Sequence, residues 1–200
     1  MMMAVADGPR IGPNAVIQVA AALANRLGTG VARELMLGAG LGAYVKAPPQ
    51  KMIDEREVIA LHSLLRERLQ PATANEVARA AGLATGDYLL ANRIPRIAQL
   101  VLRALPAPLA APLLLSAIRR HAWTFTGSGH FHATTGRPIV ITIENCPICR
   151  GANAARPQCE YYAATFARLF RRLVQRHATV RETACQACGA DQCRFEIDWD

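Results

Sequence analysis

The chain has 200 residues, of which 52% are hydrophobic, and a formal net charge of +8. This length suits one domain with a packed core, or one domain with a helical extension, and the hydrophobic content excludes a disordered protein. Lys46 and Lys51 are the only lysines, so the basic charge is almost entirely arginine. Because arginine binds carboxylates and phosphates in a bidentate way, the charge fits nucleic acid, an anionic membrane, a carboxylated ligand or a solvated basic surface.

The first half of the chain is predicted to be helical. Apolar spacing indicates helices over residues 13–27 and 54–69, and a weaker, glycine-containing helix over 31–44. Thr73 and Glu76 form a capping-box pattern that predicts the start of the next helix, and Gly82 predicts its end. Shorter helices are expected over 86–93, 95–105 and 108–120.

The pattern changes at His121. Residues 123–134 are expected to form a strand and a tight turn, and the β-branched residues 138–144 a second strand. A long amphipathic helix is expected over 158–177, followed by strands over 179–183 and 193–199. The predicted fold class is therefore α+β, with a helical N-terminal half followed by an antiparallel sheet and a long packed helix. We divide it into residues 1–52, 53–120 and 121–200, with 53–200 as one folded unit.

The chain carries no visible targeting signal. Residues 1–10 lack the basic segment and apolar core of a secretory leader. The most apolar stretch, 100–118, contains Arg103 and three prolines and makes a poor membrane span. We therefore expect a cytoplasmic protein without a transmembrane segment, whose cysteines are reduced thiols or metal ligands rather than disulfides.

All six cysteines follow residue 145, which is the strongest local signal in the sequence. Zinc prefers four tetrahedral ligands, and spacing alone allows two sets. One set joins the two C-x-x-C pairs into a four-cysteine site. The other joins three elements of the fold, as a structural metal does. Ordinary buried thiols are the alternative to a metal site. The two sets are Cys146, Cys149, Cys185 and Cys188, or Cys159, Glu182, Cys185 and Cys193.

The segment Glu182–Ile197 resembles the terminal signature of 4-vinyl-reductase-type domains. This family is related to the sensory domains of phenol-responsive transcription activators and to a Golgi transport subunit. The resemblance implies a ligand-binding fold like that of nitric-oxide-signalling and Golgi-transport domains. It also implies a structural zinc held by Cys, Glu, Cys and Cys, which correspond here to Cys159, Glu182, Cys185 and Cys193. Cys146, Cys149 and Cys188 fall outside that pattern, so the four-cysteine alternative stays open.

Two further segments, 81–96 and 121–129, resemble the bacteriochlorophyll-pathway branch of the same family. The resemblance extends from about Ile53 to the end of the chain. It implies a protein of bacteriochlorophyll biosynthesis, either a 4-vinyl (8-vinyl) reductase of divinyl protochlorophyllide-type substrates or a protein that assists other pathway enzymes. A zinc-containing, small-molecule-sensing regulatory domain is a third interpretation.

The residues themselves favour a pigment carrier over a reductase. Reduction of a vinyl group needs a hydride donor, and the nearest glycine-rich segment, Gly38–Gly42, lacks the spacing of a dinucleotide-binding loop. A magnesium tetrapyrrole is flat and apolar, with carboxylates at its edge. We predict that aromatic residues line its pocket, that arginines meet its carboxylates, and that His121 ligates the magnesium. The predicted ligand residues are Trp123, Phe125, Phe131, Tyr162, Phe166, His121, Arg93 and Arg96.

Partners other than the pigment are also constrained by the sequence. Residues 77–83 resemble the first helix and turn of a helix-turn-helix, but the segment that follows lacks a basic recognition face, so no nucleic acid is expected. Other enzymes of the pathway are the expected protein partners, and a homodimer is left open.

Overall fold

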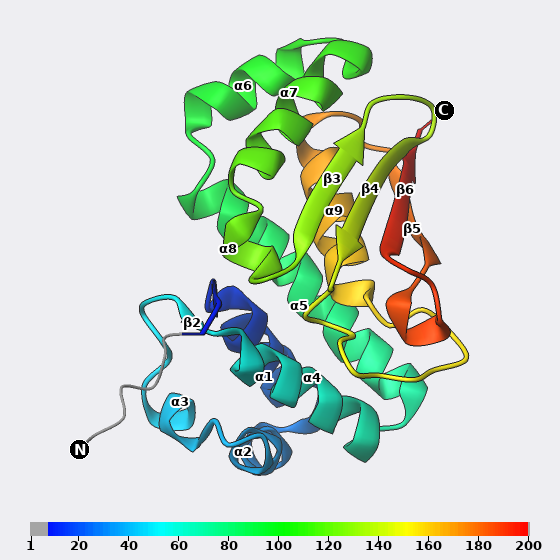
Figure 1. The fold of residues 1–200 in the computed structure, drawn as a ribbon. Helices are drawn as coiled ribbons and strands as arrows, with labels where there is room; N and C mark the ends of the chain where they lie inside the picture. The colour runs from blue at the N-terminus through cyan, green and yellow to red at the C-terminus, as the bar shows by residue number, and fades with distance from the viewer. Residues whose placement is uncertain (1–7, 200) are drawn as a thin grey trace, which may run out of the picture.

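The computed structural model describes residues 8–199, and the predictions made for residues 1–7 lie outside that range. Nine α-helices and six strands alternate along this part of the chain (Figure 1). The helices are α1 (Asn14–Leu27), α2 (Thr29–Gly38), α3 (Gly42–Lys46), α4 (Glu55–Arg68), α5 (Pro71–Asn92), α6 (Arg96–Ala104), α7 (Ala107–Arg120), α8 (Trp123–Thr126) and α9 (Glu160–Leu173). The strands are β1 (Arg10–Ile11), β2 (Ile53–Asp54), β3 (His130–Thr134), β4 (Ile139–Glu144), β5 (Thr179–Ala184) and β6 (Cys193–Asp198), with a short 3₁₀ turn, η1 (Gln186–Cys188), between the last two.

The first four helices form one end of the molecule (Figure 1). The expected helices over 13–27 and 54–69 correspond to α1 and α4. The weak helix over 31–44 is divided into α2 and α3, because Gly40 takes a left-handed conformation with φ +77°. The two-residue strands β1 and β2, which no sequence pattern indicated, pair antiparallel and join the start of the chain to the start of α4.

Helix α5 corrects two predictions. It is one continuous helix of 22 residues that begins at Pro71, so Gly82 does not end it and no separate helix starts at residue 86. Gln70 precedes its first turn, and Thr73 lies inside the helix rather than at its N-cap. Because no turn follows residue 82, the partial resemblance to a helix-turn-helix has no structural counterpart.

Close packing against α9 explains the glycines inside α5. A Cβ built on Gly82 would lie 2.3 Å from the carbonyl oxygen of Tyr161 and 2.8 Å from Ala164 Cβ. Thr165 Oγ1 also donates a hydrogen bond to the Gly82 carbonyl oxygen at 3.1 Å. The backbones of α5 and α9 therefore meet at a point where any side chain is excluded.

Gly82→Ala is accordingly expected to destabilise the fold by about 2 kcal/mol, because overpacking outweighs the better helix propensity of alanine. Gly30→Ala is the matched control, since Gly30 is also helical and a Cβ there would meet nothing within 4 Å. Urea unfolding of both variants measures the difference. A stability of Gly82→Ala equal to that of Gly30→Ala would contradict the packing argument.

Helices α6 and α7 form the end of the molecule opposite to α1–α4 (Figure 1). Pro95 and Pro106 immediately precede them, where the fixed φ of proline is compatible with a helix start. The strand expected over 123–134 is only partly correct. Residues 123–126 form the short helix α8, and the strand β3 begins at His130.

The four-stranded sheet has the order β3-β4-β6-β5, and all neighbours are antiparallel. The pairs Phe131–Ile143 and Ile141–Phe195 fix the registers of β3 on β4 and of β4 on β6. The alternation of residues along β4 buries Ile139, Ile141 and Ile143 on one face. The predicted strands over 138–144, 179–183 and 193–199 therefore correspond to β4, β5 and β6.

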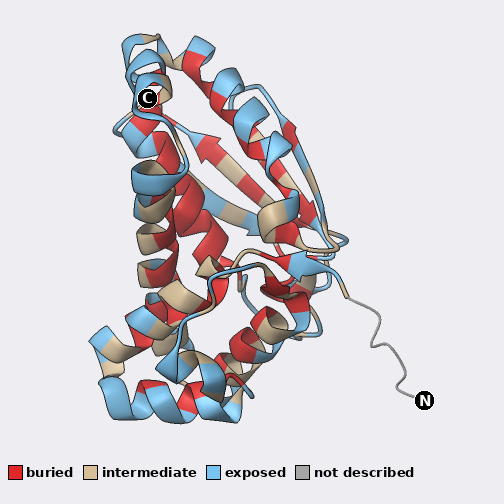
Figure 2. Cartoon of the chain, turned by 90° about the vertical axis from the view of Figure 1, so that its left-hand side faces the viewer, coloured by how far each residue is buried: buried red, intermediate tan, exposed pale blue. Residues whose placement is uncertain are grey.

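The core lies between the sheet and the helices, with α9 at its centre. Ten of the 14 residues of α9 are buried, and Figure 2 shows buried positions along this helix. A single cluster of buried apolar side chains extends from Ile11 to Trp199 and includes residues from all three predicted regions. The predicted α+β class with a long packed helix is confirmed. Among residues 8–199, no helix is long and apolar enough to cross a membrane.

Candidate metal centre

Five of the six cysteines are buried in one place, where the end of β4, the start of α9, the end of β5 and the start of β6 meet. Cys188 is exposed and belongs to neither group of side chains that could hold a metal ion. The structure therefore does not bring together the two C-x-x-C pairs as one four-cysteine site. It instead gives two overlapping sets of donors.

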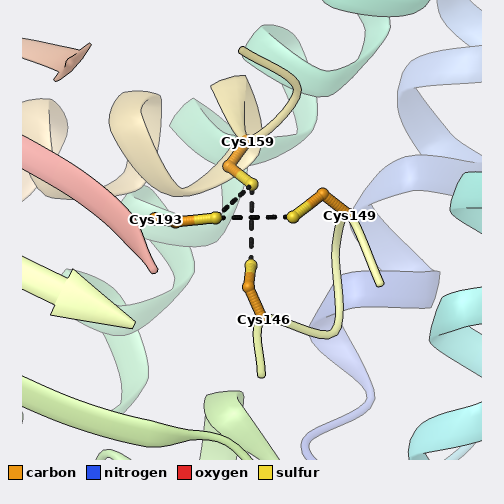
Figure 3. A group of neighbouring side chains, drawn as sticks. All are labelled: Cys146, Cys149, Cys159 and Cys193. Carbon is orange, nitrogen blue, oxygen red and sulfur yellow. Dashed lines mark hydrogen bonds between the residues drawn. The ribbon is translucent and has the colours of Figure 1, made fainter. Parts of the chain in front are cut away.

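The first set contains four thiols, Cys146, Cys149, Cys159 and Cys193, which point toward one another (Figure 3). The Sγ–Sγ distances are 3.5 Å for Cys146–Cys159, 3.4 Å for Cys149–Cys193 and 3.6 Å for Cys159–Cys193. A tetrahedral zinc with Zn–S bonds of about 2.3 Å gives S–S edges of about 3.8 Å. These thiols are thus spaced as the ligands of a tetrahedral metal are.

The second set contains the residues that the family resemblance implied, Cys159, Glu182, Cys185 and Cys193. Their ligand atoms lie within 4.8 Å of one another, and Cys193 Sγ is 3.9 Å from Cys185 Sγ. Glu182 Oε2 accepts a hydrogen bond of 2.7 Å from the Cys159 backbone N–H, while the buried Oε1 has no partner among the described residues. The structure brings these four residues together, and their binding of zinc remains a prediction.

The electrostatics of the cluster call for a cation. Burial, together with the Cys185 side chain, raises the pKa of the Glu182 carboxyl to about 9. Burial also raises the pKa of the Cys159 thiol. Without a metal, these groups would have to remain protonated or leave an unpaired buried charge, which is costly. A divalent cation would let several thiolates and the carboxylate ionise together, so the donor set fits zinc.

Local backbone structure holds the donors in place. Cys146 and Cys149 lie on the turn after β4, where the Cys146 N–H donates to Gln186 Oε1 at 2.7 Å. Cys159 precedes the first turn of α9, and Cys193 opens β6. On β5, a register irregularity between Glu182 and Ala184 precedes Cys185. The spacing of the first C-x-x-C pair was visible in the sequence, but its pairing with Cys159 and Cys193 depends on these contacts.

Helix α4 covers the cluster from the N-terminal part of the fold. Arg66 Nη1 donates to the carbonyl oxygen of Ile148, inside the Cys146–Cys149 turn, at 2.8 Å. His62 is buried, and its ring meets that of Tyr161 edge-on at 5.9 Å. Burial, followed by the nearby Arg66, lowers the pKa of His62 to about 3, so His62 is neutral at physiological pH. Arg66 is therefore the cationic side chain that α4 brings to the thiols.

A second contact between α4 and the C-terminal part centres on buried Glu55. Its carboxylate accepts hydrogen bonds from Ser128 N at 2.7 Å, from Ser128 Oγ at 2.7 Å and from Arg150 Nη1 at 2.6 Å. Burial opposes ionisation, but the hydrogen bonds from Ser128 and Arg150 outweigh it and hold the pKa of Glu55 below its ordinary value. Arg150 directly follows Cys149, so this contact also fixes the cysteine turn.

Glu55→Gln is expected to destabilise the protein by about 3 kcal/mol at neutral pH, because it leaves Arg150 without its anionic partner. The native pKa is depressed, so this stabilisation is present above the ordinary value of 4.5 and is lost as the pH falls through the native pKa. Denaturant unfolding at several pH values should show the two stabilities converging in acid. Exposed Glu67→Gln, on the same helix, is the control, and an equal loss there would contradict a specific role of Glu55.

Four of the predicted pigment residues form one aromatic cluster. Phe125 contacts Phe131, Tyr162 and Phe166 with ring centroids 5.7 to 6.3 Å apart, and Phe195 joins from β6. The Tyr162 hydroxyl donates to the Phe125 carbonyl oxygen at 2.6 Å. In this structure the rings pack against each other between α8, α9 and the sheet. Their role in lining a pigment pocket stays a prediction.

The other predicted pigment residues lie elsewhere. Trp123 is 61% exposed on α8, and His121 is exposed at the end of α7. Arg93 places its guanidinium over the Tyr88 ring, 5.8 Å from the centroid. Arg96 lines a cavity of about 360 Å³ between α5 and α6. The lining of this cavity, which the sequence did not indicate, consists of Leu90, Ala91, Arg96, Gln99, Leu100 and Arg103.

Known proteins resemble this chain over nearly its whole length. The bacteriochlorophyll synthase 23 kDa chain of Cereibacter sphaeroides is 47% identical over 188 residues, which cover 94% of this chain and 90% of the relative. The chain belongs to this family. The protein of the same name from Rhodobacter capsulatus is 42% identical over 191 residues, covering 96% of this chain and 88% of that one. The family resemblance stated from the sequence is confirmed.

The vinyl-4-reductase domain family matches residues 139–198, a range that contains all the candidate metal ligands. Among solved structures, an H-NOX protein from S. oneidensis gives a TM-score of 0.56 at 14% identity, covering 95% of this chain and 99% of that chain. An H-NOX protein from K. algicida gives 0.58 at 7% identity, with coverages of 95% and 97%. At these identities the likeness shows the fold, and it confirms the predicted ligand-binding fold class.

Proposed function

We propose that this chain binds a magnesium tetrapyrrole intermediate of bacteriochlorophyll biosynthesis and presents it to other enzymes of the pathway. The observation that carries the proposal is an apolar surface with arginines at its edge on α5–α7, in a chain whose relatives are named as chains of bacteriochlorophyll synthase. Participation in the pathway follows from the family, and the pigment and the delivery role are the proposal. We place the protein in the cytoplasm.

The proposed surface combines two features that a tetrapyrrole needs. Helices α6 and α7 leave five large apolar side chains mostly exposed to solvent, which is unusual for a monomeric protein unless the surface has a partner. Arg96 and Arg103 line the adjoining cavity, where guanidinium groups can bind propionate carboxylates in a bidentate way. The exposed side chains are Ile97, Leu100, Val101, Leu109 and Leu113.

His121 is the candidate magnesium ligand. Its Nδ1 lies 2.9 Å from the carbonyl oxygen of Ala117, one turn earlier in α7. A proton on Nδ1 satisfies this contact and leaves Nε2 as the basic nitrogen, as in histidines that ligate metals through the opposite ring atom. The fold also supports the proposal, since H-NOX proteins of this fold are described by their haem, a macrocycle of the same shape.

Zinc has a structural part in the proposal. Cys159, Glu182, Cys185 and Cys193 would hold it and so fix the start of α9 to β5 and β6. These residues lie at the opposite end of α9 from the α6–α7 surface (Figure 1). The zinc site is therefore expected to maintain the fold and to take no part in pigment binding.

The test is a titration of the purified chain with magnesium protoporphyrin, followed by absorbance. We expect a shifted pigment spectrum and a dissociation constant in the micromolar range or tighter. Burial of several hundred Å² of apolar surface contributes on the order of 10 kcal/mol before ordering and desolvation costs. Addition of NADPH and a divinyl pigment should give no 8-ethyl product. Such turnover by the chain alone would establish the reductase instead, and absence of binding would overturn both.

Trp123 provides a second measurement. Its fluorescence is expected to be quenched when pigment binds, because its exposed indole lies on the short helix that follows α7. Trp199 is the internal comparison, since it is buried and stacked on Phe170. Trp123→Ala should weaken binding by several-fold and remove most of the quenching. Unchanged affinity in this variant would exclude Trp123 from the binding surface.

A further inference from the structure

The two donor sets share two thiols. Cys159 and Cys193 belong both to the set with Cys146 and Cys149 and to the set with Glu182 and Cys185. We propose that the cluster binds two zinc ions, with the Cys159 and Cys193 thiolates bridging them. The first ion is the one in the proposed zinc site, so the inference rests on that site and adds a second ion coordinated by Cys146 and Cys149.

The number of donors matches two ions and exceeds what one can use. A structural zinc takes four ligands, and this cluster offers five buried thiols and one carboxylate. One zinc in either set would leave two buried donors without a metal. Two tetrahedra that share the Cys159–Cys193 edge use all six, with two terminal ligands on each ion.

The distances fit a shared edge. Cys159 Sγ and Cys193 Sγ are 3.6 Å apart, close to the edge of about 3.8 Å expected of a tetrahedral zinc thiolate. Cys146 Sγ lies 3.5 Å from Cys159 Sγ, and Cys149 Sγ lies 3.4 Å from Cys193 Sγ. On the other side, Cys185 Sγ lies 3.9 Å from Cys193 Sγ. The shared pair thus lies between the two terminal pairs.

The surroundings suit an anionic cluster. With all six donors ionised, two divalent ions leave excess negative charge, which nearby N–H groups can stabilise. The backbone N–H groups of Gln158 and Gln186 approach Cys185 Sγ and Cys193 Sγ at 3.4 and 3.5 Å. Arg66 adds a positive charge, and its buried Nη2 has no partner among the described residues. The Oε1 atom of Glu182, likewise unpartnered within residues 8–199, is available to an ion on the opposite side.

The decisive measurement is the metal content of the full-length protein, purified without chelators from zinc-supplemented cells. We expect two zinc ions per chain by mass spectrometry. X-ray absorption should show a Zn–Zn distance of about 3 Å, which follows from two tetrahedra sharing an edge. One zinc per chain, or no Zn–Zn vector, would overturn the second ion and leave the single zinc site standing. Absence of zinc would overturn both.

Variants separate the two positions. Cys146→Ser combined with Cys149→Ser should lower the content from two zinc ions to one and abolish the Zn–Zn vector, since the second set remains whole. Exposed Cys188→Ser is the matched control and should retain two. Two zinc ions in the double variant would overturn the assignment. The native-protein measurement remains decisive if the double variant fails to fold.

Discussion

Removal of metal by a strong chelator at neutral pH is expected to unfold the C-terminal half of the protein. The cluster joins the turn after β4, the start of α9, the end of β5 and the start of β6, so its loss separates four elements at once. Structural zinc contributes on the order of 10 kcal/mol or more, which is comparable to the whole stability of a domain. The metal-free chain should therefore lose its cooperative thermal transition in circular dichroism.

Substitution of single cysteines provides the corresponding genetic test. Cys193→Ala removes a thiol that both donor sets use and should give the same loss as the chelator. Cys188→Ala should unfold within a few degrees of the wild type, because Cys188 is exposed and outside both sets. A metal-free protein that melts cooperatively near the wild-type temperature would show that ordinary packing, rather than metal, holds this region together.

Arg96→Glu is expected to weaken binding of a carboxylated magnesium porphyrin by roughly 30-fold or more. A charge-assisted hydrogen bond contributes about 2 kcal/mol, which is roughly 30-fold in affinity, and the introduced carboxylate repels the ligand further. The change should leave the fold intact, because residue 96 is in the first turn of α6, where an acidic side chain is favoured by the helix dipole.

Arg33→Glu is the control for this second prediction. Arg33 is exposed on α2, at the other end of the molecule, and the substitution makes the same change in net charge. Binding that depended only on overall charge would fall equally in both variants, and more steeply at low salt. Equal losses would exclude the α5–α6 cavity as the carboxylate site.

Periodic segments were predictable from the sequence. Helices α4 and α9 and strands β4 and β6 each carry a clear apolar repeat, and each repeat is buried as expected. Gly82 was misinterpreted, because a helix-ending glycine and a helix-contact glycine look alike until the neighbouring helix is known. The turn at Trp123–Thr126 was assigned to a strand for a similar reason, since aromatic alternation over four residues does not specify backbone conformation.

The cysteine cluster was partly predictable. Residue types and the family pattern selected Cys159, Glu182, Cys185 and Cys193, and the structure brings these four together. The approach of Cys146 and Cys149 to the same place depends on the pairing of β4 with β6 and on the hydrogen bond from Cys146 N to Gln186. Both are long-range contacts, which spacing along one sequence does not encode.

The close approach at Gly82 has a consequence for the metal. The α9 carbonyl that fills the space of the missing side chain belongs to Tyr161, two residues after the shared ligand Cys159. A methyl group at position 82 would displace the first turn of α9 and, with it, one corner of the ligand set. Zinc release kinetics should therefore report on the spacing between two helices, and the smallest residue of α5 sets the coordination geometry of a site to which it contributes no ligand.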